Sequence, residues 1–373
     1  MAAGDLRAAR ALLEEAAATG GDLESWMSLA AVRRGLGDLP AAIAAVDHAL
    51  ALDPRYFLGL LMRASLIERL GDETAAALAY GAALTQAPPN DMLDEATRRA
   101  TQRAREAHAR YLAGLESTLR QEVAGAGGVA GRRASVFIDR LVGKRRAYHP
   151  EPVKFHYPGL PELEFHDREQ FPWIEAFEAQ TDAILAELEA VLADRSQALT
   201  PYVNYADGIP LDQWAELNRS SRWSAYHLWF NGSELAPHAA RCPRTMQAME
   251  PLPRPFVPLR GPAAMFSLLE PRTRIPPHTG ITNTRLVVHL PLVIPPGCGF
   301  RVGSETRAWR KGEAWVFDDT VEHEAWNDSD APRTILICDV WNPYLSLEER
   351  ELITRVISGV DRVSGARPEE SGL

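Results

Sequence analysis

Residues 285–292 read Arg-Leu-Val-Val-His-Leu-Pro-Leu, in which apolar residues alternate with a second set that includes Arg285 and His289. Successive side chains of a strand point to opposite faces, so this pattern predicts a half-buried β-strand with one polar face. Glycines at 297, 299 and 312 predict turns. Short apolar runs predict further strands at 314–317 and 334–338. Several short strands separated by turns indicate a sandwich or jelly roll between about 265 and 340.

Composition limits the classes of protein to which the chain can belong. Its 373 residues are 46% hydrophobic and 24% charged, as in globular proteins, and the net charge of −10 argues against binding to nucleic acid. Three scattered cysteines form neither a disulfide framework nor a CxxC zinc site. There is no basic leader and no apolar run of about 18 residues. We therefore expect a cytoplasmic protein that does not bind a membrane.

The first 123 residues are rich in Ala, Leu, Glu and Arg and are predicted to be helical. They repeat with an offset of 34 residues, which is the period of tetratricopeptide repeats. Gly-Asp pairs at 37–38 and 71–72 mark the expected turns between helices. An accidental similarity within a helical bundle is the alternative. The repeated pairs are Leu36/Leu70, Gly37/Gly71, Asp38/Asp72, Ala42/Ala76, Ala45/Ala79, Ala49/Ala83, Leu50/Leu84 and Pro54/Pro88.

The rest of the chain divides by composition. Glycine and basic residues predict a linker at 124–150, and prolines, aromatics and β-branched residues predict a second domain at 151–350. Within it, apolar residues at helical spacing from 173 to 192 predict a helix packed against a sheet. The tail 359–373 is predicted to be disordered. The fold class is therefore α+β, with a helical repeat module before a jelly roll.

Five polar residues occur in the predicted β-region, where strand geometry should bury apolar side chains. Arg285 and His289 share one face of a strand, and His323 and Arg333 flank a turn at 327–332 that we expect to join two hairpin strands. In a jelly roll all five can converge inside one open end of the barrel. They are His278, Arg285, His289, His323 and Arg333.

Two neutral imidazoles on neighbouring strands suit a first-row divalent metal, usually iron where coordination positions stay open. An arginine ten residues after the second histidine suits a bidentate bond to the distal carboxylate of 2-oxoglutarate. Taken singly, each histidine could be a structural residue and Arg333 a surface ion pair. The ordered set favours a metal site.

Three stretches together resemble the aspartyl/asparaginyl β-hydroxylase family. They are His278-Thr-Gly-Ile-Thr-Asn-Thr-Arg-Leu-Val-Val-His-Leu290, Phe317-Asp-Asp-Thr-Val-Glu-His-Glu-Ala-Trp326 and, after Arg333, Asp339-Val-Trp-Asn-Pro343. Phe171-Pro-Trp173 and the following helix also resemble the family, so the resemblance spans about 155–348. Vertebrate members likewise carry tetratricopeptide helices before the catalytic domain.

The resemblance implies a double-stranded β-helix oxygenase that uses Fe(II), 2-oxoglutarate and O₂. His278 and His323 would be the iron ligands, and Arg333 would bind the distal carboxylate of 2-oxoglutarate. His289 and Ser267 would lie near the proximal end of 2-oxoglutarate, although Ser267 could be a plain strand serine. Arg285 joins these cofactor-binding residues as a further candidate.

Gly280 stands where most related oxygenases carry the third, carboxylate ligand. A water held by Asp319 could fill this position, another residue could replace it, or chloride could enter as in related halogenases; the surrounding sequence favours the hydroxylases. Asp318 and Asp319 could equally form an ordinary turn. Val287 stands where vertebrate members are expected to have a second basic residue, which leaves the substrate class open.

The expected reaction is hydroxylation of an Asp or Asn side chain in a peptide or protein, which the helical module would help to present. Hydroxylation of a small molecule or lipid is one alternative, and a non-catalytic binding scaffold is another. Intact metal and cosubstrate residues argue against the scaffold, because buried polar groups are costly to keep. His227, His238 and Cys242 lack metal-ligand spacing and are predicted to be core or surface residues.

Overall fold

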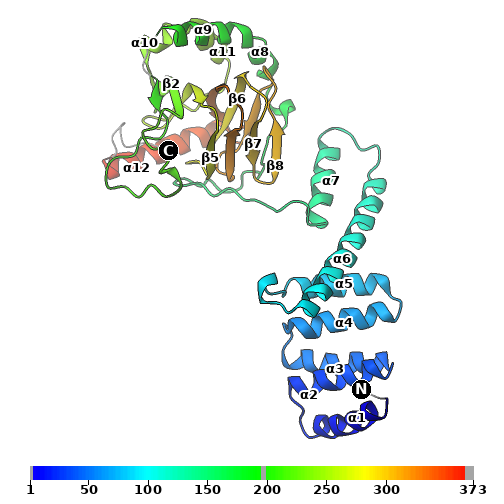
Figure 1. Ribbon diagram of the computed structural model, residues 1–373. Coiled ribbons are helices and arrows are strands. Elements are labelled where there is room, and N and C mark those ends of the chain that lie inside the picture. Colours follow the sequence, from blue (N-terminus) through cyan, green and yellow to red (C-terminus); the bar gives the residue numbers. More distant parts are fainter. Residues whose placement is uncertain (1–2, 195–198, 366–373) are drawn as a thin grey trace. The chain divides into compact units, whose positions relative to one another are not determined.

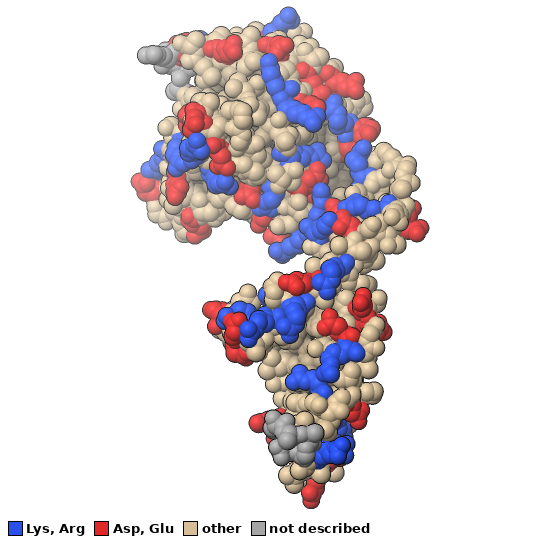
Figure 2. All heavy atoms as spheres, turned by 45° about the vertical axis from the view of Figure 1, so that its right-hand side comes forward, with Lys and Arg blue, Asp and Glu red and all other residues tan. Residues whose placement is uncertain are grey.

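The computed structural model describes residues 3–194 and 199–365, and the chain divides into two compact units between Lys144 and Arg145. The first unit is helical and the second contains two antiparallel sheets with helices, which confirms the α+β class (Figure 1). Acidic and basic side chains are intermixed on the face of each unit seen in Figure 2. In the described residues, no helix is long and apolar enough to cross a membrane.

The repeat in the first unit has a structural counterpart. Asp38 and Asp72 cap two equivalent helices by accepting hydrogen bonds from the amides of Ala41 and Ala75. Each follows a glycine with positive φ that ends the preceding helix. Identification of these helix pairs as tetratricopeptide repeats stays a prediction. The helices are α1 (Ala3–Ala18), α2 (Leu23–Gly35), α3 (Leu39–Leu52), α4 (Phe57–Arg69), α5 (Glu73–Leu84) and α6 (Glu95–Glu122).

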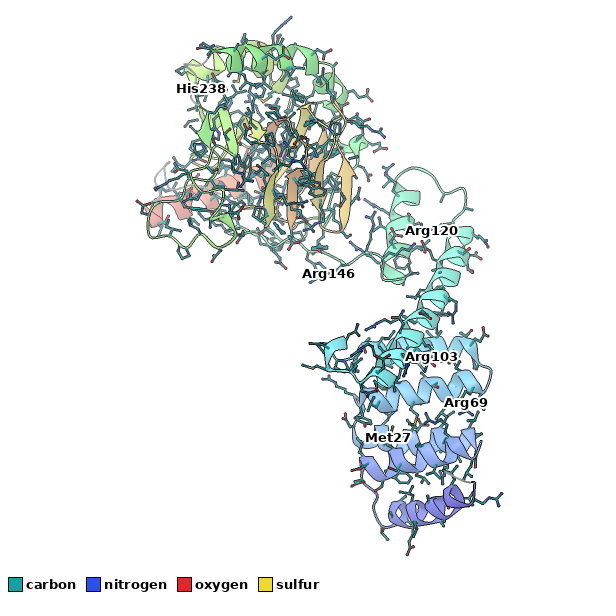
Figure 3. The ribbon with its side chains drawn as sticks, viewed as in Figure 1. Met27, Arg69, Arg103, Arg120, Arg146 and His238 are labelled. Atoms are coloured by element: carbon teal, nitrogen blue, oxygen red, sulfur yellow. The ribbon has the colours of Figure 1, made fainter. Side chains whose placement is uncertain are left out.

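The predicted linker at 124–150 is too long, because it contains helix α7 (Gly128–Leu141). Ile138 and Val142 lie one turn apart and are buried, and Arg120 of α6 donates to Ser135 and Asp139 of α7 (Figure 3). The glycines before 128 lie at the start of this helix and do not mark a linker. The end of the first unit therefore could not be predicted from glycine content alone.

In the described part of the second unit, strands form a seven-stranded and a four-stranded sheet, and every pairing within them is antiparallel. The larger sheet has the order β1-β2-β4-β11-β6-β9, with β3 beside β2, and the smaller has β5-β10-β7-β8. From β4 to β11 the chain crosses repeatedly between the sheets, which is the topology of a double-stranded β-helix.

The strand bounds are as follows. The larger sheet contains β1 (Thr200–Pro201), β2 (Trp223–Phe230), β3 (Ser233–Glu234), β4 (Ala264–Leu269), β6 (Arg285–Val293), β9 (Trp315–Phe317) and β11 (Arg333–Trp341). The smaller sheet contains β5 (Thr273–His278), β7 (Cys298–Val302), β8 (Glu305–Ala308) and β10 (His323–Asn327).

The expected hairpin between His323 and Arg333 is wrong, because β10 and β11 belong to different sheets. Asn327 directs the chain from one sheet to the other: its side-chain amide donates to the carbonyls of Leu269 and Ala331. Side-chain hydrogen bonds of this kind are not visible in a turn motif. The turn still brings both residues to the barrel interior, each from its own sheet.

Helices cover the outer face of the larger sheet. Leu286, Val288, Leu290 and Leu292 of β6 are buried in the same core as Ile184 of α9 (Thr181–Ala193). The short helices α8 (Ile174–Glu178), α10 (Ala236–Ala239) and α11 (Pro243–Met249) complete this side of the unit. The predicted packing of a helical segment on a sheet is thereby confirmed, and the polar face of β6 points between the sheets.

The predicted disordered tail begins too early. Helix α12 (Leu347–Ser364) continues through residue 359, because Ile353 and Ile357 pack against Trp341 and Gly365 ends the helix in the left-handed conformation. A capping box at Ser346 begins it. Residues 366–373 of that predicted tail lie outside the described residues.

Candidate active site

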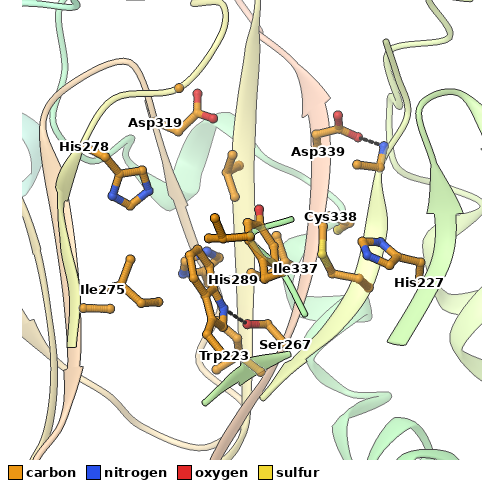
Figure 4. A pocket seen from close by; sticks show the side chains of 18 of the residues that line it. Trp223, His227, Ser267, Ile275, His278, His289, Asp319, Ile337, Cys338 and Asp339 are labelled. Carbon is orange, nitrogen blue, oxygen red and sulfur yellow. Dashed lines mark hydrogen bonds between the residues drawn. The ribbon is translucent and has the colours of Figure 1, made fainter. Parts of the chain in front are cut away.

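A cavity of about 480 Å³ lies between the two sheets. Its wall includes every side chain that the sequence analysis selected as a site residue, although the roles of these residues stay predictions. They are Ser267, His278, Arg285, His289, Asp319, His323 and Arg333. Figure 4 shows part of this wall, with His278 and Asp319 on one side and His227 and Asp339 on the other.

His278 and His323 are paired across β5 and β10, and their ring centroids lie 4.0 Å apart. Nδ1 of His278 donates to the carbonyl of Pro276 (2.8 Å), and Nδ1 of His323 donates to that of Val321 (3.0 Å). A carbonyl only accepts, so both Nε2 atoms keep the lone pair that binds a metal. Burial lowers the pKa of His278 to about 3 and that of His323 to about 4, which keeps both rings neutral.

Asp319 lies beside these histidines, next to Gly280. A Cβ added to Gly280 would lie 2.2 Å from Oδ2 of Asp319, so this carboxylate occupies the space of a side chain at 280. Its Oδ1 is buried without a hydrogen-bond partner, and burial raises the pKa of the carboxyl group. No group of three or more His, Cys, Asp and Glu side chains in the described chain is arranged to hold a metal ion. The side chains here that could bind a metal are the two imidazoles, each through its Nε2.

Arg285 extends from β6 between two carboxylates. Its Nη2 lies 3.2 Å from Oδ2 of Asp319, and its Nε lies 3.7 Å from Oδ2 of Asp339. Asp339 accepts a hydrogen bond at Oδ1 from the amide of Ala263 (2.8 Å), and burial raises its pKa to about 6. Arg285 therefore has carboxylate partners within the protein, which distinguishes it from Arg333.

Arg333 is a buried cation without a carboxylate partner among the described residues. It is 2% exposed, its Nη1 has no hydrogen-bond partner, and its guanidinium lies 5.6 Å from the ring of Trp309. Burial lowers its pKa to about 10, so it stays charged at neutral pH. A buried unpaired charge is costly, so this end of the cavity is built for an anion.

Two further unpartnered nitrogens lie near Arg333. His289 stacks on Trp309 with ring centroids 5.7 Å apart, and both His289 Nδ1 and Trp309 Nε1 are buried without a hydrogen-bond partner. Burial and the charge of Arg333 hold the pKa of His289 well below its usual value. The structure thus places His289 at the same end of the cavity as Arg333.

Ser267 of β4 is held by an indole. Nε1 of Trp223 donates to its Oγ at 3.0 Å (Figure 4), and Trp223 stacks on Tyr202. Because the Ser267 oxygen accepts this bond, its own hydrogen is available to a ligand in the cavity.

Sequence reasoning missed several residues of the wall. His227, predicted as a core or surface residue, is half-buried on the cavity wall with a buried, unpartnered Nδ1, and it shares a strand face with Trp223. Asp339 shares a face of β11 with Arg333, so alternation could have revealed it. Trp309 follows β8 in a segment without a strand pattern, and no sequence signal marks it.

The comparisons with known proteins concern the part of the chain that contains this cavity. Residues 178–343 match the family model described as Aspartyl/Asparaginyl beta-hydroxylase. The aspartyl/asparaginyl beta-hydroxylase of Homo sapiens is 37% identical over 152 residues, which are 40% of this chain and 20% of that protein. The ornithine lipid ester-linked acyl 2-hydroxylase of Rhizobium tropici is 31% identical over 199 residues, which are 52% of this chain and 66% of that protein.

Solved structures add little. A Cupin 2 conserved barrel domain protein from Salinispora arenicola covers 41% of this chain and 99% of its own, with 12% identity and a TM-score of 0.22. The strand order, and not this similarity, defines the fold. The chain spans only a fifth of the length of the human hydroxylase. Residues 178–343, which include both histidines and Arg333, therefore match the aspartyl/asparaginyl β-hydroxylase family, which is a family of hydroxylases.

Proposed function

We propose that the chain is an Fe(II)- and 2-oxoglutarate-dependent dioxygenase that hydroxylates the β-carbon of an Asp or Asn side chain in a peptide or protein. The observation that carries the proposal is a single cavity that offers two metal-binding imidazoles and, on the same wall, the unpaired buried cation of Arg333. A cosubstrate with both a metal-chelating end and an anionic end matches this pair of sites.

His278 and His323 would hold the iron through Nε2. Once bound there, Fe(II) would supply the chemistry by which 2-oxoglutarate, O₂ and a substrate C–H group yield succinate, CO₂ and the hydroxylated product. Asp319, with an unpartnered Oδ1, would hold a water at the position that Gly280 leaves open. The neutral state of both imidazoles means that no proton has to leave before the metal binds.

Arg333 would bind the distal carboxylate of 2-oxoglutarate. Trp309 Nε1 is a donor without acceptor capacity, so it would give this carboxylate a second bond, with His289 beside it. Ser267 would donate to the cosubstrate through its free hydroxyl hydrogen. Charge-assisted bonds of this kind are strong where water is excluded.

A lipid or small molecule is a second candidate substrate. Val287 is buried on the cavity wall beside Arg285, and it offers no charge to an acidic side chain. The lipid hydroxylase named above shows that one relative acts on an acyl group. The helical unit would present a peptide if the substrate is a peptide. A cytoplasmic location stays a prediction from the sequence.

The test is the conversion of 2-oxoglutarate to succinate by the purified full chain, measured with Fe(II), with Zn(II) in its place, and without O₂. We expect succinate only when Fe(II), 2-oxoglutarate and O₂ are all present. Succinate formation that does not need Fe(II), or no succinate with any candidate substrate, would show that the proposed chemistry is wrong.

A further inference from the structure

Three arginines line the cavity, and they differ in their partners. Arg260 and Arg285 each lie within ion-pair distance of a buried carboxylate, whereas for Arg333 the described residues provide none. Charge at the cavity wall is therefore uneven. One end has an unbalanced cation, and the other has guanidinium groups that are already neutralised by the protein.

Arg285 is neutralised by two carboxylates. Asp319 and Asp339 are 7% and 2% exposed, and both direct Oδ2 toward its guanidinium. One guanidinium between two buried carboxylates leaves no net positive charge for a third. Even when one of the two is protonated, the remaining carboxylate balances the cation.

Arg260 is neutralised from α12. Its Nε lies 3.1 Å from Oδ2 of Asp361, and its Nη2 contacts Oδ1 of the same carboxylate. Both side chains are largely buried, so this pair is fixed by two hydrogen bonds and is not a mobile surface contact. Its Nη1 has no hydrogen-bond partner, but Asp361 already balances the charge of Arg260 for a ligand at this end of the cavity.

Most of the other side chains at this end are apolar. The wall is built from both strands and loops. Asn231 adds a polar side chain to it, and His227 lies near Asp339 with a neutral ring, because burial lowers its pKa to about 4. Figure 4 shows His227 and Asp339 on the same side of the cavity. The apolar lining residues here are Phe230, Leu235, Met265, Val287 and Ile337.

We propose that this end, between Asp339, Arg285 and Val287, binds an uncharged aliphatic group of the substrate and excludes a carboxylate, with Asp339 as the residue that sets the preference. A carboxylate placed here would lose its hydration without gaining a free cation, and it would lie close to two like charges. The inference rests on the Fe(II) and 2-oxoglutarate chemistry of the proposed function and, between its two candidate substrates, favours an aliphatic chain over an aspartate side chain.

Octanamide and octanoate test this, because they share one chain and differ in charge. Calorimetric titration would use the full chain loaded with Fe(II) and saturating 2-oxoglutarate without O₂, so that the Arg333 end is filled. We expect octanamide to bind at least tenfold more tightly than octanoate. Equal or tighter binding of octanoate, or no binding of either probe, would overturn the proposal.

Asp339→Asn is the informative variant, since it removes one of the two like charges that a bound carboxylate would lie close to. Binding of octanoate should improve at least tenfold, while octanamide changes little. Asp328→Asn is the matched control, because Asp328 is an exposed carboxylate paired with Arg274 outside the cavity. If Asp339→Asn does not fold, Val287→Arg should shift the preference toward octanoate; an unchanged ratio in the folded variant contradicts the proposal.

Binding of two peptides that differ only in having Asn or Asp tests whether the uncharged group is an Asn side chain or an aliphatic chain. Binding of the Asn peptide without octanamide would show that the aliphatic-chain assignment is wrong. Titration of 2-oxoglutarate alone separates this inference from the proposed function. If 2-oxoglutarate does not bind, the proposed function is wrong. The dissociation constants of octanamide and octanoate are then compared in Arg333→Met, where octanoate finds no unpaired guanidinium.

Discussion

The carboxylate of Asp319 fills the space that a side chain on Gly280 would occupy. A Cβ at 280 would meet Oδ2, Cγ and Oδ1 of Asp319 at 2.2, 2.3 and 2.6 Å, and the amide of Gly280 donates to the backbone carbonyl of Asp319. The two residues lie at the ends of segments that carry His278 and His323. The carboxylate at 319 can therefore lie where it does only because residue 280 has no side chain.

Gly280→Ala should destabilise the protein, because the new methyl group displaces Asp319 from Arg285. Overpacking of this kind costs about 1–3 kcal/mol. In Gly280→Ala/Asp319→Ala the space is free, so the double variant should be more stable than the sum of the single effects predicts. Chemical unfolding of the four proteins measures the coupling.

Gly114→Ala is the control, since a Cβ at this position in α6 meets no neighbour within 4 Å. It should stabilise the protein by up to about 1 kcal/mol, because glycine in a helix interior is unfavourable. Additive effects of the changes at 280 and 319 would show that the two residues are not coupled.

His278→Ala and His323→Ala should each abolish Fe(II)-dependent succinate formation. Only two protein ligands are proposed, so each should matter more than in a site with three. Metal content after dialysis against Fe(II) should also fall, which gives a measurement independent of turnover. His156→Ala, an exposed histidine of the same unit, is the control. Near-normal metal content in either variant would show that the substituted histidine is not a metal ligand.

Arg333→Met should weaken binding of 2-oxoglutarate by about one hundredfold or more, because charge-assisted bonds are worth roughly 1.5–3 kcal/mol each. Metal binding should change little, since the guanidinium is not a ligand. Arg274→Met removes an exposed arginine that is paired with Asp328 and should leave the affinity unchanged. If the dissociation constant for 2-oxoglutarate is unaltered in the Arg333 variant under anaerobic conditions, 2-oxoglutarate does not bind at this end of the cavity.

Much of the β-fold and its interior was predictable because strands bury alternate residues. The pattern of β6 placed Arg285 and His289 on one face, and that face does line the cavity. The sheet to which each strand belongs was harder to predict: the expected hairpin at 327–332 is a crossing between sheets. Its direction depends on hydrogen bonds of Asn327 to residues about 60 positions away, which no local pattern contains.

The site shows the same limit. His278 and His323 could be selected because histidine is unusual in a strand region. Trp309 has the sequence pattern of any core aromatic residue, and only the structure shows its unpartnered Nε1 near Arg333. Asp339 could be placed on a strand face, but its approach to Arg285 depends on two paired strands. Charge balance inside a cavity is a property of tertiary structure, and spacing along the chain does not give it.

His166 should make the protein less stable in acid. Burial lowers its pKa to about 4, so between roughly pH 6.5 and pH 4 the unfolded chain takes up a proton that the folded chain does not. The free energy of unfolding should therefore fall as pH falls through this window, by up to about 1.4 kcal/mol per pH unit from this residue. Relative to wild type, His166→Phe should gain stability from pH 7 to pH 4.5; a constant difference would contradict the assignment.

Trp309→Phe should weaken 2-oxoglutarate without affecting the metal, because it removes the indole N–H and keeps an aromatic ring beside Arg333. One hydrogen bond to a charged acceptor is worth about 1.5–3 kcal/mol, so the dissociation constant should rise roughly tenfold to a hundredfold. A short 2-oxo acid without a distal carboxylate should bind equally to both proteins. Trp315→Phe is the matched control: Trp315 is equally buried and stacks on Trp309 at 4.3 Å, but it is not among the described residues that line the cavity. Equal losses in the two variants would mean that Trp309 acts through packing alone, and a loss for the short acid as well would place its N–H away from the distal carboxylate.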